Sequence, residues 1–263
     1  EIYIGSEYPV LVQSMLNTDT MNTEACVEQA IRIIEAGGKL VRITAPGIKE
    51  AKNLENIHAE LRRRGYTTPL SADIHFNPEA AIEAARHVEK VRINPGNFVD
   101  KRATFKTLTY TDEEYAAELE RLREKFTAFL DVCREYGTAV RIGTNHGSLS
   151  DRIMSRYGNT PAGMVEATME YLRVCRDVKF DDVVISLKSS DCRVMVEAVR
   201  LLVKEMEKEV MDYPLHLGVT EAGEGEDGRI RSAVGIGTLL NEGLGDTIRV
   251  SFTEEPEQEI PVA

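Results

Sequence analysis

The sequence predicts an α/β fold, a single (β/α)8 barrel of the TIM type. Eight short runs rich in Val, Ile and Leu are distributed over 263 residues, and most are followed by an amphipathic segment with helical periodicity. This alternation is typical of a parallel sheet covered by helices. The length suits one domain of this kind, and eight repeats favour a closed barrel over an open doubly wound sheet.

The eight strands are expected where aliphatic and β-branched residues form short, nearly continuous runs, because strands buried on both faces have this pattern. They are expected at residues 11–15, 40–44, 70–73, 90–93, 139–143, 183–187, 215–220 and 247–252.

Helices are expected between the strands, and residues 113–136 are predicted to form the longest. The other helices are expected to begin near Thr23, Ile48, Pro78, Pro161, Asp191 and Gly228. The predicted N-caps are Asn77, Thr160 and a capping box of Thr111 with Glu114, and the predicted C-terminal glycines are Gly37, Gly65 and Gly137. The chain after the eighth strand is too short for a full closing helix, so the barrel is expected to end before it.

Composition excludes several classes of protein. The formal net charge is −12, which argues against nucleic acid or an anionic membrane as partner. No apolar run approaches ~18 residues and no secretory leader is recognisable, so a cytoplasmic location is expected. The four cysteines form no C-x-x-C pair, and we expect buried free thiols and no metal site within this chain.

Basic residues interrupt five of the apolar runs, at or near the carboxyl ends of the predicted strands. They are Arg42, Arg92, Arg141, Lys188 and Arg249. A cation in a strand covered on both faces is not solvated, so it must face an anion. Guanidinium groups bind phosphate oxygens bidentately, and several cations suit a diphosphate or two phosphates better than one carboxylate. The sequence therefore predicts a phosphate site at this end of the barrel.

Other polar residues follow the same strands. Asn145 and Ser251 offer neutral hydrogen bonds, while Asp73 and His75 share one strand face and could share a proton or orient a hydroxyl. Glu221 ends the seventh strand, where it either takes part in proton chemistry or balances a cation. Further polar groups expected at this end are Gln13, Ser14, Asn94 and the backbone of residues 94–97, where Gly96 would permit close approach to a phosphate.

Five segments carry a family resemblance: residues 12–15 (VQSM), 72–76 (ADIHF), 92–97 (RINPGN), 141–145 (RIGTN) and 215–223 (LHLGVTEAG). In this order, from about Val10 to Pro256, the chain resembles the family of (E)-4-hydroxy-3-methylbut-2-enyl diphosphate synthases. These are the iron–sulfur enzymes of the non-mevalonate isoprenoid pathway. The chain would be their barrel domain.

The resemblance implies an oxidoreductase that converts 2-C-methyl-D-erythritol 2,4-cyclodiphosphate to the allylic diphosphate by reductive ring opening and dehydroxylation. It also implies a [4Fe-4S] cluster, held by three Cys and one Glu of a C-terminal domain and supplied by ferredoxin or flavodoxin. That domain is expected to lie outside residues 1–263, which form one substrate-binding domain, so the isolated chain should bind substrate without turning it over.

Residues 98–126 resemble the longer plant and chlamydial type, which has an inserted domain after the barrel. This domain, too, would lie outside the chain. The compact form pairs two chains head to tail, whereas the long form can close on itself, so a homodimer and a monomer both stay open.

The resemblance assigns roles to individual positions. Residues that match the diphosphate-gripping positions are Arg42, Arg92, Arg141, Asn145, Lys188, Arg249 and Ser251. Glu221 matches the carboxylate near the reacting carbons, and Asp73 and His75 are further catalytic candidates. Two alternatives remain. One is a barrel transferase acting on another phosphorylated metabolite, similar to dihydropteroate synthase, and the other is a non-catalytic anion-binding module whose cations pair with Asp and Glu.

Overall fold

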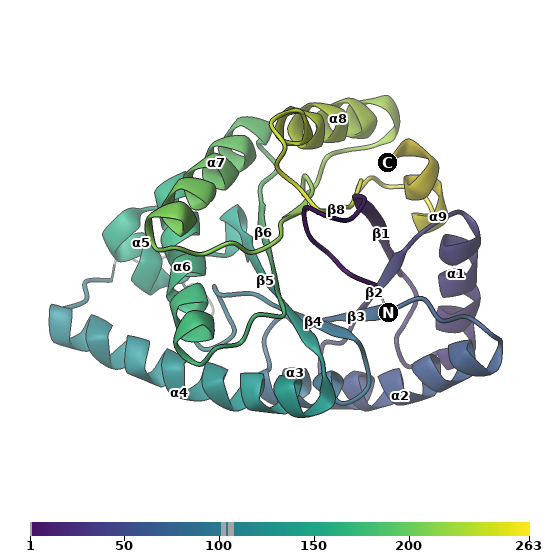
Figure 1. The fold of residues 1–263 in the computed structure, drawn as a ribbon, viewed down its shortest axis with the longest axis horizontal. Helices are drawn as coiled ribbons and strands as arrows, with labels where there is room; N and C mark the ends of the chain where they lie inside the picture. The colour runs from purple at the N-terminus through teal and green to yellow at the C-terminus, as the bar shows by residue number, and fades with distance from the viewer. Residues whose placement is uncertain (1, 101–103, 105–107) are drawn as a thin grey trace.

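The structure, a computed structural model, describes residues 2–100, 104 and 108–263. Eight parallel strands form a nearly closed barrel surrounded by helices, which confirms the predicted fold (Figure 1). The strands are β1 (Leu11–Met15), β2 (Leu40–Thr44), β3 (Leu70–Asp73), β4 (Lys90–Ile93), β5 (Ala139–Asn145), β6 (Val183–Lys188), β7 (His216–Leu217) and β8 (Thr247–Ile248).

Strand pairing runs almost completely around the barrel. The strands pair in the order β6-β5-β4-β3-β2-β1-β8-β7. A parallel bridge between Ile185 of β6 and Leu215, just before β7, joins the two ends of this order, and the Ile185 N–H donates to the Pro214 carbonyl at 2.9 Å. Strands far apart in sequence are therefore held around one common interior.

The first four strands have the predicted bounds, and the last four differ from them. Strands β5 and β6 extend further toward the carboxyl end, whereas β7 and β8 contain two residues each. Backbone bonds continue past these short strands, because the Arg249 N–H donates to the Leu217 carbonyl and the Thr220 N–H to the Ser189 carbonyl. These isolated bonds lack the two-sided pairing of a regular strand, so the ladder ends early.

The helices begin within a few residues of the predicted positions. They are α1 (Thr23–Glu35), α2 (Ile48–Arg63), α3 (Pro78–Ala85), α4 (Asp112–Tyr136), α5 (Asp151–Tyr157), α6 (Pro161–Asp177), α7 (Cys192–Lys208), α8 (Gly225–Asn241) and α9 (Pro256–Glu259). The capping box of Thr111 and Glu114 and the left-handed C-cap at Gly137 are confirmed. Helix α5 is not among the predicted helices, because seven residues are too few to show helical periodicity.

The segment after β8 folds back onto the start of the barrel. Helix α9 and the following 3-10 turn, η2 (Ile260–Val262), lie beside α1 and β1 (Figure 1). The Ser14 hydroxyl donates to the Pro256 carbonyl at 2.9 Å, and Arg32 forms an ion pair with Glu257. The position of an eighth outer helix is thus occupied by a short one. Part of the segment 98–126, predicted to be unusually long, lies outside the described residues.

The two faces of the strands differ sharply. Outward residues such as Val41, Ile93 and Ile142 are buried in apolar contact with the helices. Inward residues of the same strands include Arg42 and Arg141, which are almost fully buried. TIM barrel interiors are usually filled by layers of branched aliphatic side chains, so a cationic interior requires an explanation.

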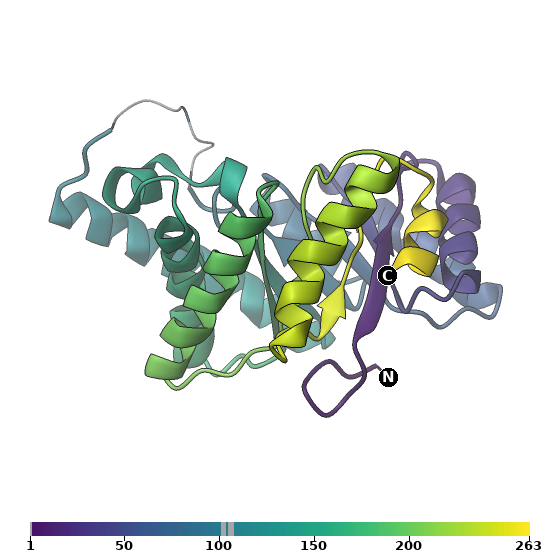
Figure 2. The ribbon, with the colours of Figure 1, turned by 90° about the horizontal axis from the view of Figure 1, so that it is seen from above.

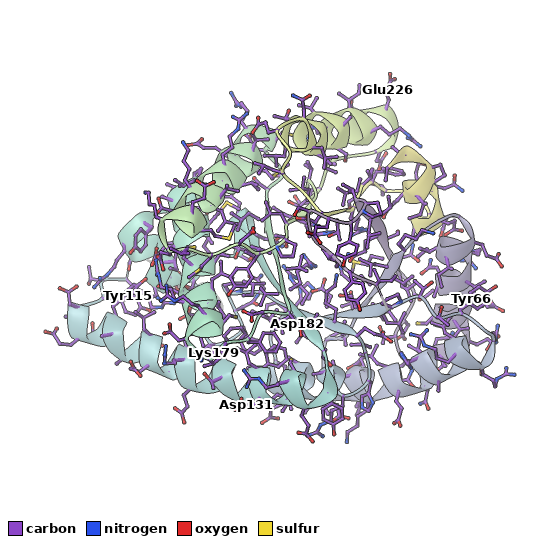
Figure 3. The ribbon with its side chains drawn as sticks, viewed as in Figure 1. Tyr66, Tyr115, Asp131, Lys179, Asp182 and Glu226 are labelled. Atoms are coloured by element: carbon purple, nitrogen blue, oxygen red, sulfur yellow. The ribbon has the colours of Figure 1, made fainter. Side chains whose placement is uncertain are left out.

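Side chains crowd the space that the strands enclose, while labelled residues such as Tyr66 and Tyr115 lie near the outer helices (Figure 3). In the side view, the N-terminal segment lies at the end where the strands begin, and loops that follow the strands gather at the opposite end (Figure 2). Among the described residues, none of the helices combines the length and the apolar character that crossing a bilayer requires.

Candidate functional site

A cavity of about 560 Å³ opens at the carboxyl ends of the strands. Its lining contains all ten residues to which the sequence analysis assigns catalytic or diphosphate-binding roles: Arg42, Asp73, His75, Arg92, Arg141, Asn145, Lys188, Glu221, Arg249 and Ser251. A larger hollow of about 640 Å³ lies on the outer helices α7 and α8, away from the strand ends. Of these two cavities, the one at the strand ends brings the predicted cations together.

Asp73 holds two of the guanidinium groups. Its Oδ1 lies 2.8 Å from Arg92 Nη1, and its Oδ2 lies 3.1 Å from Arg42 Nε. Burial by itself would raise the pKa of Asp73, but Arg92 and Arg42 hold it well below its usual range. The carboxylate therefore stays ionised at neutral pH and fixes the positions of both cations.

Arg249 is held by a carboxylate that the sequence analysis missed. Its Nε and Nη2 lie 3.1 and 3.0 Å from the two oxygens of Glu259 in α9, and the Ser14 hydroxyl donates to the same carboxylate at 2.7 Å. Glu259 belongs to an acidic segment that resembles a solvated tail, so the pattern gave no signal. The prediction that Ser14 faces the site is wrong, because strand alternation turns it toward α9 and places Met15 in the cavity lining.

Arg141 and Lys188 have no carboxylate of the described residues within ion-pair distance. Arg141 is 1% exposed, and its Nη1 donates to the Ser186 hydroxyl at 2.6 Å, while its Nε and Nη2 have no hydrogen-bond partner in the part of the chain that the structure describes. Burial lowers the pKa of Lys188, and the neighbouring guanidiniums lower it further. A Cβ at Gly218 would lie 2.8 Å from Lys188 Nζ, so the missing side chain makes room for this amine.

The cavity therefore carries an excess of positive charge. Counted in their protonated forms, five cations face two pairing carboxylates among the described residues, Asp73 and Glu259, which leaves three positive charges. Glu221 at the mouth reduces the excess to two. Buried charge without a counter-charge is strongly unfavourable. This arrangement fits a dianionic ligand. It does not fit the alternative of a non-catalytic module in which every cation forms an ion pair with Asp or Glu.

The mouth of the cavity holds the groups suited to proton chemistry. His75 Nε2 lies 3.5 Å from Asp73 Oδ1, and the His75 side chain is 40% exposed. Glu221 has a backbone φ of 51°, in the left-handed region. For a residue with a side chain this conformation costs roughly 1–2 kcal/mol, and such strain clusters at functional sites.

The prediction for residues 94–97 is wrong. The Asn94 amide donates to the Ser148 hydroxyl at 2.8 Å, and its oxygen accepts from the Gly96 N–H at 3.0 Å. A Cβ at Gly96 would lie 1.6 Å from the Ser148 carbonyl oxygen, so this glycine permits close approach to the loop after β5 and not to a phosphate. Gln13 is fully buried and does not line the cavity either.

Several lining residues are absent from the predicted set. They are Met15, Thr44, His146, Gly147, Ser148, Ser189, Ser190, Val219 and Thr220. Most are small or hydroxyl-bearing residues in loops directly after the strands. Residues of these types are common at any turn, so their identity does not mark them as site residues. Their position directly after a strand is the one feature of the sequence that could have identified them.

Lys90 lies inside the barrel and was also missed. It is 4% exposed, and its Nζ has no hydrogen-bond partner among the described residues. Burial, together with the positive charges of Arg141 and Arg42, lowers its pKa from 10.5 to about 7. Its position two residues before Arg92 is the signal that could have identified it, since alternate residues share a strand face.

We expect the stability of the ligand-free protein to rise with pH between about pH 7 and 10.5, in part because of Lys90. In this interval the unfolded chain keeps the Lys90 proton and the folded protein loses it, so the unfolded state binds more protons. Urea unfolding at pH 7, 8 and 9 measures how steeply the free energy of unfolding rises with pH. Lys90→Met should flatten this rise and stabilise the protein most at pH 7, whereas the exposed-site variant Lys125→Met should not. An unchanged slope in Lys90→Met would contradict this.

The cysteines do not form a cluster site. All four are free thiols; Cys26, Cys133 and Cys175 are buried as predicted, but Cys192 is partly exposed, which corrects that prediction. Burial raises the pKa of Cys133 to about 12, and metal ligation requires the thiolate. Across residues 2–100, 104 and 108–263, no group of three His, Cys, Asp or Glu side chains could hold a metal ion. The described residues therefore do not fit a [4Fe-4S] cluster.

Comparison with known proteins gives a consistent result. Residues 1–263 match the model of the GcpE TIM-barrel domain. The chain is 66% identical over 260 residues to the 4-hydroxy-3-methylbut-2-en-1-yl diphosphate synthase (flavodoxin) of Parabacteroides distasonis, covering 99% of this chain and 43% of the relative. It is 56% identical over 257 residues to the protein of that name in Protochlamydia amoebophila, covering 98% of this chain and 39% of the relative. The chain thus spans about two fifths of the length of these relatives.

Solved structures support the fold alone. Dihydropteroate synthase from Yersinia pestis matches with a TM-score of 0.58 and 12% identity, over 98% of this chain and 94% of that one. D-allulose 3-epimerase from Methylomonas matches with a TM-score of 0.59 and 10% identity, over 93% of this chain and 84% of that one. Enzymes of different chemistry share this fold, so function must be argued from the site.

Proposed function

The chain belongs to the GcpE TIM-barrel family, and on that premise we propose that it is the substrate-binding barrel of a 4-hydroxy-3-methylbut-2-en-1-yl diphosphate synthase. The proposed substrate is 2-C-methyl-D-erythritol 2,4-cyclodiphosphate. One observation carries the proposal: cations from separate strands converge on one cavity and exceed the carboxylates that pair with them.

The substrate's charge fits this excess. Each phosphate of a cyclic diphosphate is linked through two of its oxygens and keeps one ionised oxygen, so the ligand is a dianion at neutral pH. The unpartnered Nε and Nη2 of Arg141 and the amine of Lys188 would donate to it, with Arg249 completing the grip. Asn145 and Ser251 would hydrogen-bond the remaining oxygens.

The other residues have distinct proposed roles. Asp73 fixes Arg42 and Arg92 through its ion pairs and so acts on the substrate through them. His75 lies at the mouth, where it can orient a hydroxyl or exchange a proton. The reaction consumes two electrons and one proton. The ring C–O bond breaks and leaves its oxygen on the diphosphate, and the C–O bond of the hydroxyl on the adjacent carbon breaks and releases that oxygen as water. Glu221 would pass a proton to this departing oxygen.

Electrons must come from outside the described residues. A [4Fe-4S] cluster would supply them when bound, and its three Cys and one Glu ligands are proposed to lie beyond this chain. The names of the relatives include flavodoxin, which we propose as electron donor ahead of ferredoxin. A cytoplasmic enzyme without nucleic-acid or membrane partners fits the net charge of −12.

Calorimetric titration of the full-length protein with 2-C-methyl-D-erythritol 2,4-cyclodiphosphate tests this function. We expect saturable binding of one ligand per chain, and turnover to the allylic diphosphate only with a reductant present. Absence of binding would contradict the proposal. Turnover of another phosphorylated metabolite without any electron source would instead favour the transferase alternative.

Replacing Glu221 by glutamine should lower kcat at least about 100-fold, because the amide cannot supply the proton and general acids contribute on this scale. KM should change only a few-fold, since the cations that hold the diphosphate remain. Steady-state kinetics with a chemical reductant measures both constants, and Glu224→Gln in the following loop is the matched control. A large rise in KM with unchanged kcat would assign Glu221 to binding instead.

A further inference from the structure

Lys90 places a buried amine below the proposed diphosphate site, because it precedes Arg92 by two residues on the same face of β4. Its Nζ lacks any hydrogen-bond partner among the described residues, and its side chain points into the barrel, as that of Arg92 does two residues later. The charged groups that act on it most strongly are the guanidiniums of Arg141 and Arg42. Buried polar groups are normally satisfied, so this amine calls for an explanation.

Among the described residues, the surrounding strands offer Lys90 no carboxylate that is free of another cation. The titratable and charged groups that share the barrel interior are Arg42 on β2, Asp73 on β3, Arg92 on β4, Arg141 on β5, Lys188 on β6, His216 on β7 and Arg249 directly after β8. Asp73 is the single carboxylate of this set, and Arg42 and Arg92 occupy both its oxygens. Burial lowers the pKa of His216 well below its usual range, so this ring is neutral.

We propose that Lys90 is a positioning residue that takes up a proton when the cyclic diphosphate binds, and so adds a positive charge beneath the ligand. The dianion would screen the field of Arg42 and Arg141, which otherwise repels an ammonium group. This inference rests on the proposed function for the identity of the ligand.

Proton uptake by Lys90 determines the direction in which ligand affinity changes with pH. The pKa of Lys90 is about 7 in the ligand-free protein, so at pH 8 the amine is mostly neutral. A bound dianion raises this pKa, and the complex then holds more protons than its components. Affinity must therefore fall as pH rises above about 7, by up to about tenfold per pH unit.

Calorimetry of the full-length protein at pH 8, in Tris and in HEPES, measures the uptake, because the two buffers differ in ionisation enthalpy. The cyclic diphosphate is a fixed dianion at this pH, so any proton taken up resides on the protein. The wild type should take up more protons than Lys90→Met. Lys90→Arg should bind at least as tightly as the wild type, with reduced uptake and a flatter pH profile. Lys125→Met should match the wild type.

Comparison among variants isolates Lys90, because Lys188 and any other group that changes protonation contribute in all of them. Tight binding with the same proton uptake in the wild type, Lys90→Met and Lys90→Arg would overturn the inference and leave the proposed function intact. Absence of binding would overturn the proposed function. Sulfate, also a fixed dianion near neutral pH, then tests Lys90 separately: uptake that disappears in Lys90→Arg supports its role, and unchanged uptake overturns it.

Discussion

Replacing Arg141 by alanine is expected to weaken binding of the cyclic diphosphate about 100-fold, because it removes a buried charged donor from the ligand. Arg141 is the guanidinium with two nitrogens left without partners, and no carboxylate of the described residues competes for it. The affinity is measured by calorimetry on the full-length protein at pH 7.

Stability separates this loss from misfolding. Arg141 makes one side-chain hydrogen bond, to Ser186, and lies among other cations, so its removal should leave the ligand-free protein as stable as the wild type or more so. Arg134→Ala on the outer helix α4 is the matched control and should bind normally. Unchanged affinity in Arg141→Ala would contradict the prediction that Arg141 binds the ligand.

Replacing Asp73 by asparagine should destabilise the ligand-free protein by about 3 to 5 kcal/mol, the cost of breaking a buried ion pair from one side. The amide has nearly the same shape but leaves Arg42 and Arg92 without their shared carboxylate. Since the folded-state pKa of Asp73 is lowered, its contribution is present above its ordinary pKa of 3.8 and is lost as pH falls through the folded value.

Urea unfolding at pH 7 measures this loss, with Asp131→Asn on the exposed face of α4 as control. Saturating cyclic diphosphate should restore part of the stability in Asp73→Asn, because the dianion neutralises the same guanidiniums. A variant as stable as the wild type would show that these guanidiniums do not depend on Asp73.

Local sequence patterns are sufficient for the fold and for every Arg, Lys, Asp and Glu side chain of the cavity lining, which make up the charged part of the site. Alternation along a strand places Arg42, Arg92 and Arg141 on the inward face, and the parallel topology gathers them at one end of the barrel. The same alternation explains why the prediction for Ser14 is wrong: of the neighbours Ser14 and Met15 on β1, Met15 faces the cavity and Ser14 faces α9.

The remaining features depend on contacts between distant segments. Glu259 reaches Arg249 because α9 folds back against β1, and no local pattern encodes that packing. A glycine is required at position 96 because the backbone there packs closely against Ser148, more than fifty residues away in sequence. Taken alone, the sequence of residues 94–97 resembles a phosphate-binding loop. Lys90 was overlooked because it lies near the start of a strand, where catalytic groups are not expected.

A crystal structure of the full-length protein with 2-C-methyl-D-erythritol 2,4-cyclodiphosphate tests the central claim most directly. We predict both phosphorus atoms inside the strand-end cavity, with oxygens within hydrogen-bond distance of Arg141, Lys188 and Arg249. A ligand bound at the outer helices, or at the end of the barrel where the strands begin, would contradict it.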